Sequence, residues 1–387
     1  MKHYRKTRLL LLAFLFCNAT LPAQEPNENK LKITPTARFY YDGAAYFTDD
    51  TQLSNGTTMP DVRLGLKAKY GKFDIKVDIG YGEKKVKPKD IFMDYHLNSH
   101  SHFRVGHVAP PFGLESWETT SSIKFLSENP NSLLFGTDRV LGVTYARYGQ
   151  RYVVSASVIG DSNAFANDTE GNDGYGLMAD GKYVVHQKPQ SLLVCGVSSY
   201  IRTGNANGYN EDGNENPRIL HFASAMNTKV EKRKPISFVV EDVDYQNASV
   251  LYMEGRYRQF FLHTEGFFMN IKRKHELPSY RANGFYVQGG VLLFGDESYR
   301  FDAVEKKTTR PQRGLELVIR YCHTDMDHNW ARINAGKMTD VSFASNYYLN
   351  NHVCLRLNYI YQKMGRNCAF LAGENVSSIQ GRLQVTF

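Results

Sequence analysis

Basic side chains recur at every second position in several segments of the chain. In one segment Arg63, Lys67 and Lys69 alternate with apolar residues, and the next segment repeats the pattern with Lys76. Residues at alternate positions of a strand point to the same face. Arginine stays charged at physiological pH and offers paired donors that match phosphate and carboxylate. A row of such side chains could therefore bind anions weakly and pass them along one wet face.

Acidic residues share this wet face, which leaves two interpretations open. In one, the charges pair across the wall and stabilise a hydrated interior; in the other, an excess of arginine favours anions. The predicted basic positions, our candidates for pore-lining anion contacts, are Arg38, Arg63, Lys67, Lys69, Lys76, Arg104, Arg256, Arg258, Arg320, Arg356 and Arg382. The acidic positions are Asp42, Asp74, Asp78, Asp94, Glu254, Glu265, Glu316 and Asp340.

A second basic cluster stands apart from the alternating segments. It consists of Lys229, Lys232, Arg233 and Lys234, in a long polar stretch between two predicted strands. Such a cluster could gather anions at the mouth of a channel by long-range attraction. A solvated run of charge in an external loop is the commoner explanation.

The elements that must position these residues are strands with a period of two. The final segment, Ser377 to Phe387, has one apolar face and one polar face and ends on an aromatic residue. This ending is typical of an outer-membrane β-barrel, in which the last strand pairs with the first and removes both sheet edges. We expect Phe387 to be read by the barrel-assembly machinery.

The alternation predicts an all-β fold, a 16-stranded antiparallel transmembrane β-barrel. The predicted strands are 31–48, 60–70, 73–81, 90–97, 101–108, 138–148, 151–160, 174–184, 190–202, 247–258, 260–271, 283–295, 313–324, 338–349, 352–363 and 377–387. Residues 219–227 are left out, since both termini should lie on the periplasmic side, and this requires 203–246 to be one long external loop. The same parity places the long link 296–312 on the periplasmic side, where turns are normally short.

The first residues are expected to leave the mature protein. A basic start, an apolar run and a small residue before a polar one predict a signal peptide over residues 1–23, with the barrel over 24–387. Its removal lowers the formal charge from +8 to +4, because residues 1–23 hold four basic residues and no acidic one. Mean hydropathy is −0.44 and no long apolar run follows, so membrane-spanning helices are excluded. A nucleic-acid partner has little support.

Other chemistry is weakly indicated. His323, Asp325, Asp327 and His328 could in principle hold a metal, but they fall at a strand end where such residues are ordinary. No GxSxG or HExxH sequence joins the Ser, His and acidic residues. We therefore predict no catalytic residue, no metal and no cofactor.

Several motifs carry a resemblance to a known family. Residues 104–115 (RVGHVAPPFGLE), 141–143 (LGV), 284–288 (GFYVQ) with 294–300 (FGDESYR), and Asn358-Tyr359 resemble, in order, the phosphate-selective porins O and P of Gram-negative outer membranes. The resemblance implies a trimer of sixteen-stranded barrels, with 109–137 folded inward as the constriction. It also implies arginines along the passage and lysines near the constriction, for which Lys124 is the nearest candidate beside the wall arginines.

The residues and the resemblance together predict an outer-membrane porin for passive diffusion of small anions, with phosphate or pyrophosphate as candidate solutes. A general diffusion porin with little selectivity is one alternative. A plugged barrel that acts as a surface adhesin or structural anchor is another. An outer-membrane hydrolase is the least supported.

Overall fold

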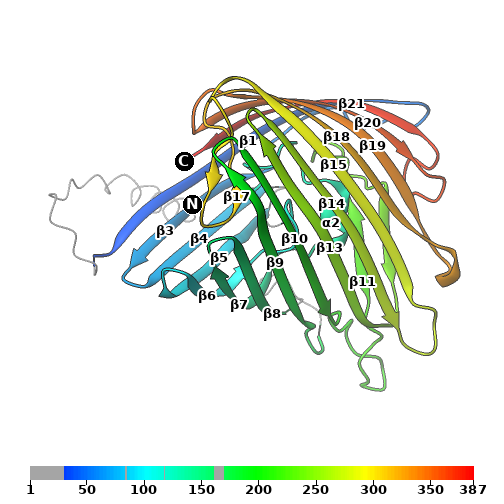
Figure 1. Ribbon diagram of the computed structural model, residues 1–387. Helices are drawn as coiled ribbons and strands as arrows, with labels where there is room; N and C mark the ends of the chain where they lie inside the picture. Colours follow the sequence, from blue (N-terminus) through cyan, green and yellow to red (C-terminus); the bar gives the residue numbers. More distant parts are fainter. Residues whose placement is uncertain (1–29, 83–84, 117, 161–169) are drawn as a thin grey trace, which may run out of the picture.

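The computed structural model describes residues 30–82, 85–116, 118–160 and 170–387. The predicted signal peptide lies outside these residues. The chain forms a closed antiparallel β-barrel, which confirms the predicted fold (Figure 1). Its main sheet has 17 strands, of which β2 (Gly56–Thr58) is a short addition to β1, so sixteen strands make the wall.

The wall strands occur at nearly the predicted positions. They are β1 (Lys32–Thr48), β3 (Val62–Tyr70), β4 (Phe73–Gly82), β5 (Lys85–Asn98), β6 (Ser101–Val108), β7 (Val140–Tyr148), β8 (Tyr152–Gly160), β9 (Tyr175–Lys188), β10 (Ser191–Arg202), β13 (Val243–Tyr257), β14 (Phe260–Arg273), β15 (Tyr280–Gly295), β18 (Gly314–His328), β19 (Ile333–Tyr348), β20 (Val353–Met364) and β21 (Asn375–Thr386). β1 pairs with β21 from Arg38 opposite Thr386 to Thr48 opposite Val376. This pairing closes the cylinder and leaves no free edge.

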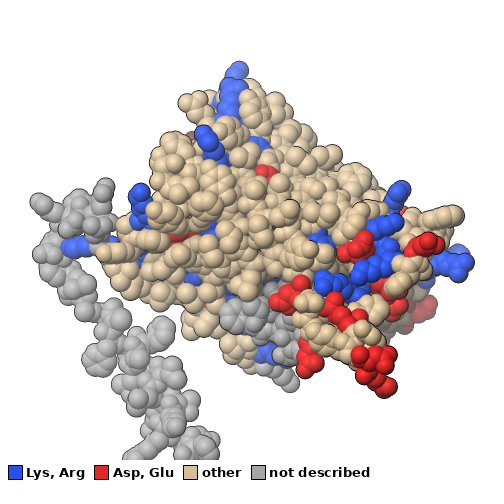
Figure 2. Space-filling view, turned by 90° about the horizontal axis from the view of Figure 1, so that it is seen from below, with Lys and Arg blue, Asp and Glu red and all other residues tan. Residues whose placement is uncertain are grey.

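The alternation of the sequence sets which side chains face inward. In β20, Leu355, Leu357 and Tyr359 are exposed on the outer surface, whereas Arg356 and Asn358 between them are buried inside the barrel. A slip of one residue would put the arginine on the apolar surface, so the register is strongly determined. Figure 2 shows the outcome on one face, where the middle of the wall carries few charged atoms and most of them gather at one end.

The two ends of the barrel differ in the length of their links. The start of β1 and the end of β21 lie together, and we name this the terminal end. Most links at the terminal end are short, such as Gly71–Lys72 between β3 and β4. The exception is 296–313 between β15 and β18, which contains the small strands β16 (Phe301–Asp302) and β17 (Lys307–Thr308). Longer links predominate at the opposite, loop end.

The stretch 203–246 is more ordered than a simple loop. It contains β11 (Leu220–Ser224) and β12 (Ile236–Val240), which pair with each other as a separate two-stranded sheet. The strand signal over 219–227 is therefore real, but β11 is no part of the wall, as the parity argument required. The only helices in the described residues are α2 (Pro130–Phe135) and the 3-10 turn η1 (Asn329–Ala331), and neither could span a membrane.

Candidate functional site

The link between β6 and β7, residues 109–139, lies inside the barrel, and we name it the inner loop. Arg356 on the far wall holds its tip: Nη2 donates to the Ser121 carbonyl (2.8 Å), and Nη1 donates to the carbonyls of Ile123 (2.6 Å) and Phe125 (3.0 Å). Asn131 Nδ2 donates to the His323 carbonyl of β18 at 3.1 Å. The inner loop therefore crosses the lumen and is fixed to the opposite wall.

The helix α2 gives the inner loop its shape. Asn129 caps this helix, because its side-chain oxygen accepts from the Ser132 amide at 3.0 Å, and Pro130 follows at the first helical position. The Glu115 carboxylate in turn accepts from the Asn129 amide at 2.8 Å. These bonds satisfy buried polar groups within the loop itself, so the loop keeps one conformation in the lumen.

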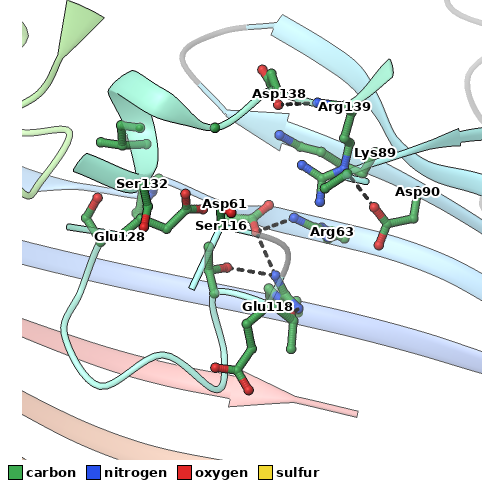
Figure 3. A pocket seen from close by; sticks show the side chains of 18 of the residues that line it. Asp61, Arg63, Lys89, Asp90, Ser116, Glu118, Glu128, Ser132, Asp138 and Arg139 are labelled. Carbon is green, nitrogen blue, oxygen red and sulfur yellow. Dashed lines mark hydrogen bonds and ion pairs between the residues drawn. The ribbon is translucent and has the colours of Figure 1, made fainter. Parts of the chain in front are cut away.

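A cavity of about 600 Å³ remains between the inner loop and the wall formed by β1, β3 to β6 and β21 (Figure 3). We name it the eyelet. Its basic residues are Arg38, Arg63, Lys76, Lys89, Arg104, Arg139, Lys229 and Arg382. Its acidic residues are Asp61, Asp90, Glu118, Glu128 and Asp138. Basic side chains thus outnumber acidic ones by eight to five.

Two arginines in the eyelet share one carboxylate. Arg63 Nη2 lies 2.9 Å from Asp61 Oδ2, and Arg38 Nη1 lies 3.3 Å from the same oxygen. Arg38 also donates to the hydroxyls of Thr119 and Thr120 on the inner loop. Burial opposes the ionisation of Asp61, but Arg63 and Arg38 outweigh it and keep the pKa of Asp61 below its usual value. Arg63 also lies 3.7 Å from Asp78, so Arg38 and Arg63 are positioned beside the cavity by two carboxylates.

Asp90 on β5 is shared in the same way. Lys76 Nζ lies 2.6 Å from Asp90 Oδ2. Arg139 Nε lies 2.7 Å from Asp90 Oδ1 (Figure 3). Lys76 also lies 3.0 Å from Asp78. The bases of the eyelet are therefore positioned by carboxylates, and Asp61 and Asp90 each position two of them.

Burial shifts the ionisation of two of the acidic residues. Burial, with the nearby charges of Glu115 and Asp138, raises the pKa of Glu128 to about 8. Burial also raises the pKa of Glu118. A carboxyl group with a pKa near 8 is mostly protonated at neutral pH. Protonation of Glu128 adds to the positive charge at the eyelet, whereas Asp42, Asp78 and Asp94, which pair with Arg382, Arg63 and Arg104, reduce it.

The other side of the lumen is packed. Lys124 Nζ lies 2.7 Å from Glu316, which also accepts from the hydroxyls of Tyr299 (2.7 Å) and Tyr348 (2.8 Å). Arg320 has no exposed surface, and its guanidinium carbon lies 4.1 Å from the centre of the Phe125 ring. These bases hold the inner loop against the wall.

The predicted pore-lining residues therefore divide into three groups. Those at the eyelet are Arg38, Arg63, Lys76, Arg104 and Arg382. Those buried in the packed side are Lys124, Arg256, Arg320 and Arg356. Those elsewhere are Lys67 and Lys69, exposed near the terminal end of β3, and Arg258, which lies in the β13–β14 turn with a φ of 52° rather than on the wall.

The predicted external basic cluster is divided as well. Lys229 lines the eyelet, whereas Lys232 and Lys234 are exposed at the loop end. Arg233 Nη2 forms an ion pair with Glu231 Oε2 at 2.8 Å. The hydrogen bonds from Arg233 lower the pKa of Glu231 to about 2. Only part of this cluster therefore faces the passage.

Sequence reasoning missed seven charged residues of the eyelet, namely Asp61, Lys89, Asp90, Glu118, Glu128, Asp138 and Arg139. Lys89 and Asp90 fell at a predicted strand start, but β5 begins at Lys85 and carries both on the wall. Asp61 lies inside the predicted strand 60–70 on the same face as Arg63, so the alternation did mark it. Arg139 lies inside the predicted strand 138–148, but it has the parity of Leu141 and Val143, which face outward.

The described residues hold no group of His, Cys, Asp and Glu arranged to bind a metal. Their four cysteines, Cys195, Cys322, Cys354 and Cys368, are all free. His323 instead contacts the Thr339 hydroxyl at 2.9 Å, and Lys337 lies 2.7 Å from Asp325. These side chains have ordinary structural partners.

Comparison with known structures supports the fold. The anion-selective porin from Comamonas acidovorans has a TM-score of 0.58 with 11% identity over 92% of this chain and 100% of that one. The outer-membrane channel DcaP of Acinetobacter baumannii has a TM-score of 0.57 with 11% identity over 95% and 100%. In-vitro folded OmpT of Vibrio cholerae, in its trimer form, has a TM-score of 0.57 with 9% identity over 92% and 99%.

Comparison by sequence adds the family. No curated protein matches the chain. The family model of the phosphate-selective porins O and P matches residues 34–387, nearly the whole sequence, and thus confirms the resemblance. A closed barrel with a charged eyelet fits a channel of the Gram-negative outer membrane rather than an enzyme. The chain belongs to the phosphate-selective porin O and P family and is an outer-membrane porin.

Proposed function

We propose that this porin gives passive diffusion of small anions through the eyelet. The observation that carries the proposal is the eight-to-five excess of basic over acidic residues around a cavity of about 600 Å³. In a narrow space bounded by protein, such an excess raises the local anion concentration and lowers that of cations. The anion-selective porin of Comamonas acidovorans supports the proposal through its fold.

The geometry explains how an anion could be bound without being trapped. Arg38 and Arg63 would contact an anion while Asp61 remains between them at 3.3 and 2.9 Å. Since each guanidinium keeps a carboxylate partner, the anion replaces water rather than neutralising a bare charge. Conduction requires that binding be favourable enough for entry and weak enough for exit. Lys76 and Arg139, which share Asp90, offer a second position of the same kind.

Phosphate or pyrophosphate is the proposed solute within this class. Planar guanidinium groups bind phosphate oxygens through paired donors. The hydroxyls of Thr119 and Thr120 both accept hydrogen bonds from Arg38. They therefore add neutral hydrogen-bonding groups beside this arginine. The family assignment supports the same solute.

A general diffusion porin with little selectivity is the second candidate. The observation in its favour is the pairing of wall charges: Arg104 makes two bonds to Asp94 (2.7 and 2.8 Å), and Arg382 makes two to Asp42 (both 2.7 Å). Bases held this tightly contribute less field to the passage. Selectivity would then rest on the residues that share Asp61 and Asp90.

Reversal potentials in planar bilayers across a KCl gradient test the proposal. We expect a reversal potential whose sign indicates anion preference. We also expect chloride conductance to fall as phosphate is added. Conductance without ion preference, and without an effect of phosphate, would favour the general diffusion porin. Cation preference would overturn the proposal. Absence of conductance would favour a plugged barrel acting as an adhesin or anchor.

Assembly is also proposed rather than observed. The trimer form of OmpT supports a homotrimer, which light scattering of the detergent-solubilised protein would test. Phe387 is 69% exposed, and its backbone exchanges hydrogen bonds with Ala37 (2.8 and 3.2 Å). Its exposed ring supports recognition by the barrel-assembly machinery. Phe387→Ala should reduce the amount of barrel in the outer membrane without changing its conductance.

A further inference from the structure

The long link at the terminal end, residues 296–313, also enters the lumen, and we name it the inner strap. Tyr299 is its deepest residue and is 1% exposed. Its hydroxyl donates to Glu316 of β18 at 2.7 Å, and its ring packs edge-on against Phe261 of β14, with centroids 5.4 Å apart. The inner strap is therefore anchored to the inner wall rather than lying outside the barrel.

The other contacts of the inner strap extend across the lumen. The Tyr299 carbonyl accepts from Arg256, and the Thr308 amide donates to Glu254, both residues lying on β13. Phe301 packs against the buried cluster of Val184, Leu192 and Val194 on β9 and β10. At the tip of the strap, Glu305 accepts from the Tyr148 hydroxyl of β7 at 3.2 Å. The strap thus reaches from β18 to β7.

The inner strap meets the inner loop that enters from the other end. Arg310 Nη1 donates to the Ser121 carbonyl at 3.3 Å, while Nη2 donates to the Asn351 carbonyl in the β19–β20 turn at 2.7 Å. Lys124 of the inner loop lies over the Tyr299 ring at 5.1 Å. Together the two segments fill the lumen beside β13, β14 and β18, whereas the eyelet opens beside β1, β3, β5 and β6.

We propose that the inner strap forms a second narrowing of the passage, in series with the eyelet, and that Glu305 at its tip is a specificity-determining residue. The carboxylate of Glu305 interacts electrostatically with Arg104, a residue of the eyelet wall, and with His102 beside it. A negative charge at this place reduces the field that draws anions toward the terminal end. This inference rests on the proposed function, because it assigns a second determinant of selectivity to the same passage.

The first test changes charge alone. Glu305→Gln removes the negative charge and keeps an oxygen that can accept from Tyr148. We expect the ratio of anion to cation permeability to rise by about twofold, as for one partly screened charge near the passage. Glu297→Gln is the matched control, since Glu297 is an exposed acid on the same segment, and it should leave the ratio unchanged. An unchanged ratio in Glu305→Gln overturns the assignment of Glu305.

The second test removes the narrowing. Replacing 298–311 by a short Asn-Gly turn should raise single-channel conductance by about twofold or more, because channel conductance follows the open cross-section. Circular dichroism and retention of the folded form on unheated gels would show that the barrel is intact. A folded variant with the original conductance overturns the narrowing. If the shortened chain does not fold, Tyr299→Ala with the same readout decides the question.

The two proposals fail in different ways. A wild-type channel that conducts without anion preference removes the proposed function, whatever the variants do. A wild-type channel with clear anion preference whose conductance and permeability ratio are unaffected by changes in the inner strap removes only this inference.

Discussion

The two halves of the lumen use the same residue type for different purposes. Arg63 on the eyelet side lies 2.9 Å from Asp61 and lines a cavity. Arg320 on the packed side lies 3.8 Å from Glu115 and 4.0 Å from Asp340, with no exposed surface. Both arginines belong to wall strands and both point inward. The difference is that the inner loop covers Arg320 and leaves Arg63 beside open space.

The comparison shows that inward orientation alone does not make a residue part of the passage. Arg356 points inward, but its guanidinium donates hydrogen bonds to three carbonyls of the inner loop. Burying a charge lowers the free energy of unfolding unless the charge is paired or fully hydrogen-bonded. On the packed side Arg320 and Arg356 therefore hold the inner loop in place, whereas on the eyelet side the arginines line the cavity.

The largest effect should follow from releasing the inner loop. Arg356→Met removes charge-assisted hydrogen bonds to three buried carbonyls, which should lower the free energy of unfolding by about 3 kcal/mol. The loop tip would then move, and single-channel conductance should become larger and more variable. Arg366→Met is the control, because Arg366 is exposed in a loop-end link. Unchanged conductance and thermal stability in Arg356→Met would contradict the anchoring role.

A smaller change is expected from the eyelet itself. Arg63→Gln leaves Asp61 with Arg38 alone and removes one positive charge beside the cavity. The preference for anions should fall by about fivefold, equivalent to roughly 1 kcal/mol of electrostatic energy. Arg258→Gln carries the same charge change in a turn and should alter the reversal potential little. Equal effects of the two substitutions would show that the eyelet has no special role.

The pH dependence of the anion preference tests the eyelet side of the comparison between the two halves of the lumen. Glu128 has a pKa near 8, so it gains negative charge as pH rises through this value, and the anion preference should fall by about twofold between pH 7 and pH 9. The folded protein should also lose stability as pH rises from 4.5, the ordinary pKa of a glutamate, toward 8, because the unfolded chain releases this proton first. Glu128→Gln should remove this step in the reversal potential. A step that persists in the variant would assign the titration to another group.

The smallest effect is expected at the loop end. Lys232→Gln combined with Lys234→Gln removes two exposed charges that lie outside the eyelet. Anion conductance should fall by less than about twofold at low salt and return to the wild-type value at high salt, where such charges are screened. Loss of conductance that persists at high salt would place these lysines in the passage.

The fold was largely predictable because a lipid-facing wall imposes a strict pattern. In β20, Leu355 and Leu357 must face lipid, so Arg356 must face inward. The division of inward residues into two groups was not predictable, because it depends on where the inner loop and the inner strap pack. No alternation in 109–139 or 296–313 predicts that the Ser121 carbonyl accepts hydrogen bonds from Arg356 and Arg310. Arg139 was not predictable, because it has the parity of the outward-facing Leu141 and Val143. Asp61 could have been predicted, because it shares the inward face of the strand 60–70 with Arg63.

Reaction with a charged thiol reagent tests the asymmetry of the lumen most directly. In a variant without Cys195, Cys322, Cys354 and Cys368, Lys76→Cys would place a thiol at the eyelet, and Ser342→Cys would place one on the packed inner wall, where Ser342 has no exposed surface. We predict that an anionic methanethiosulfonate added to the open channel modifies Lys76→Cys and lowers its conductance, while Ser342→Cys does not react. Rapid reaction at Ser342→Cys, or none at Lys76→Cys, would contradict a passage confined to the eyelet side.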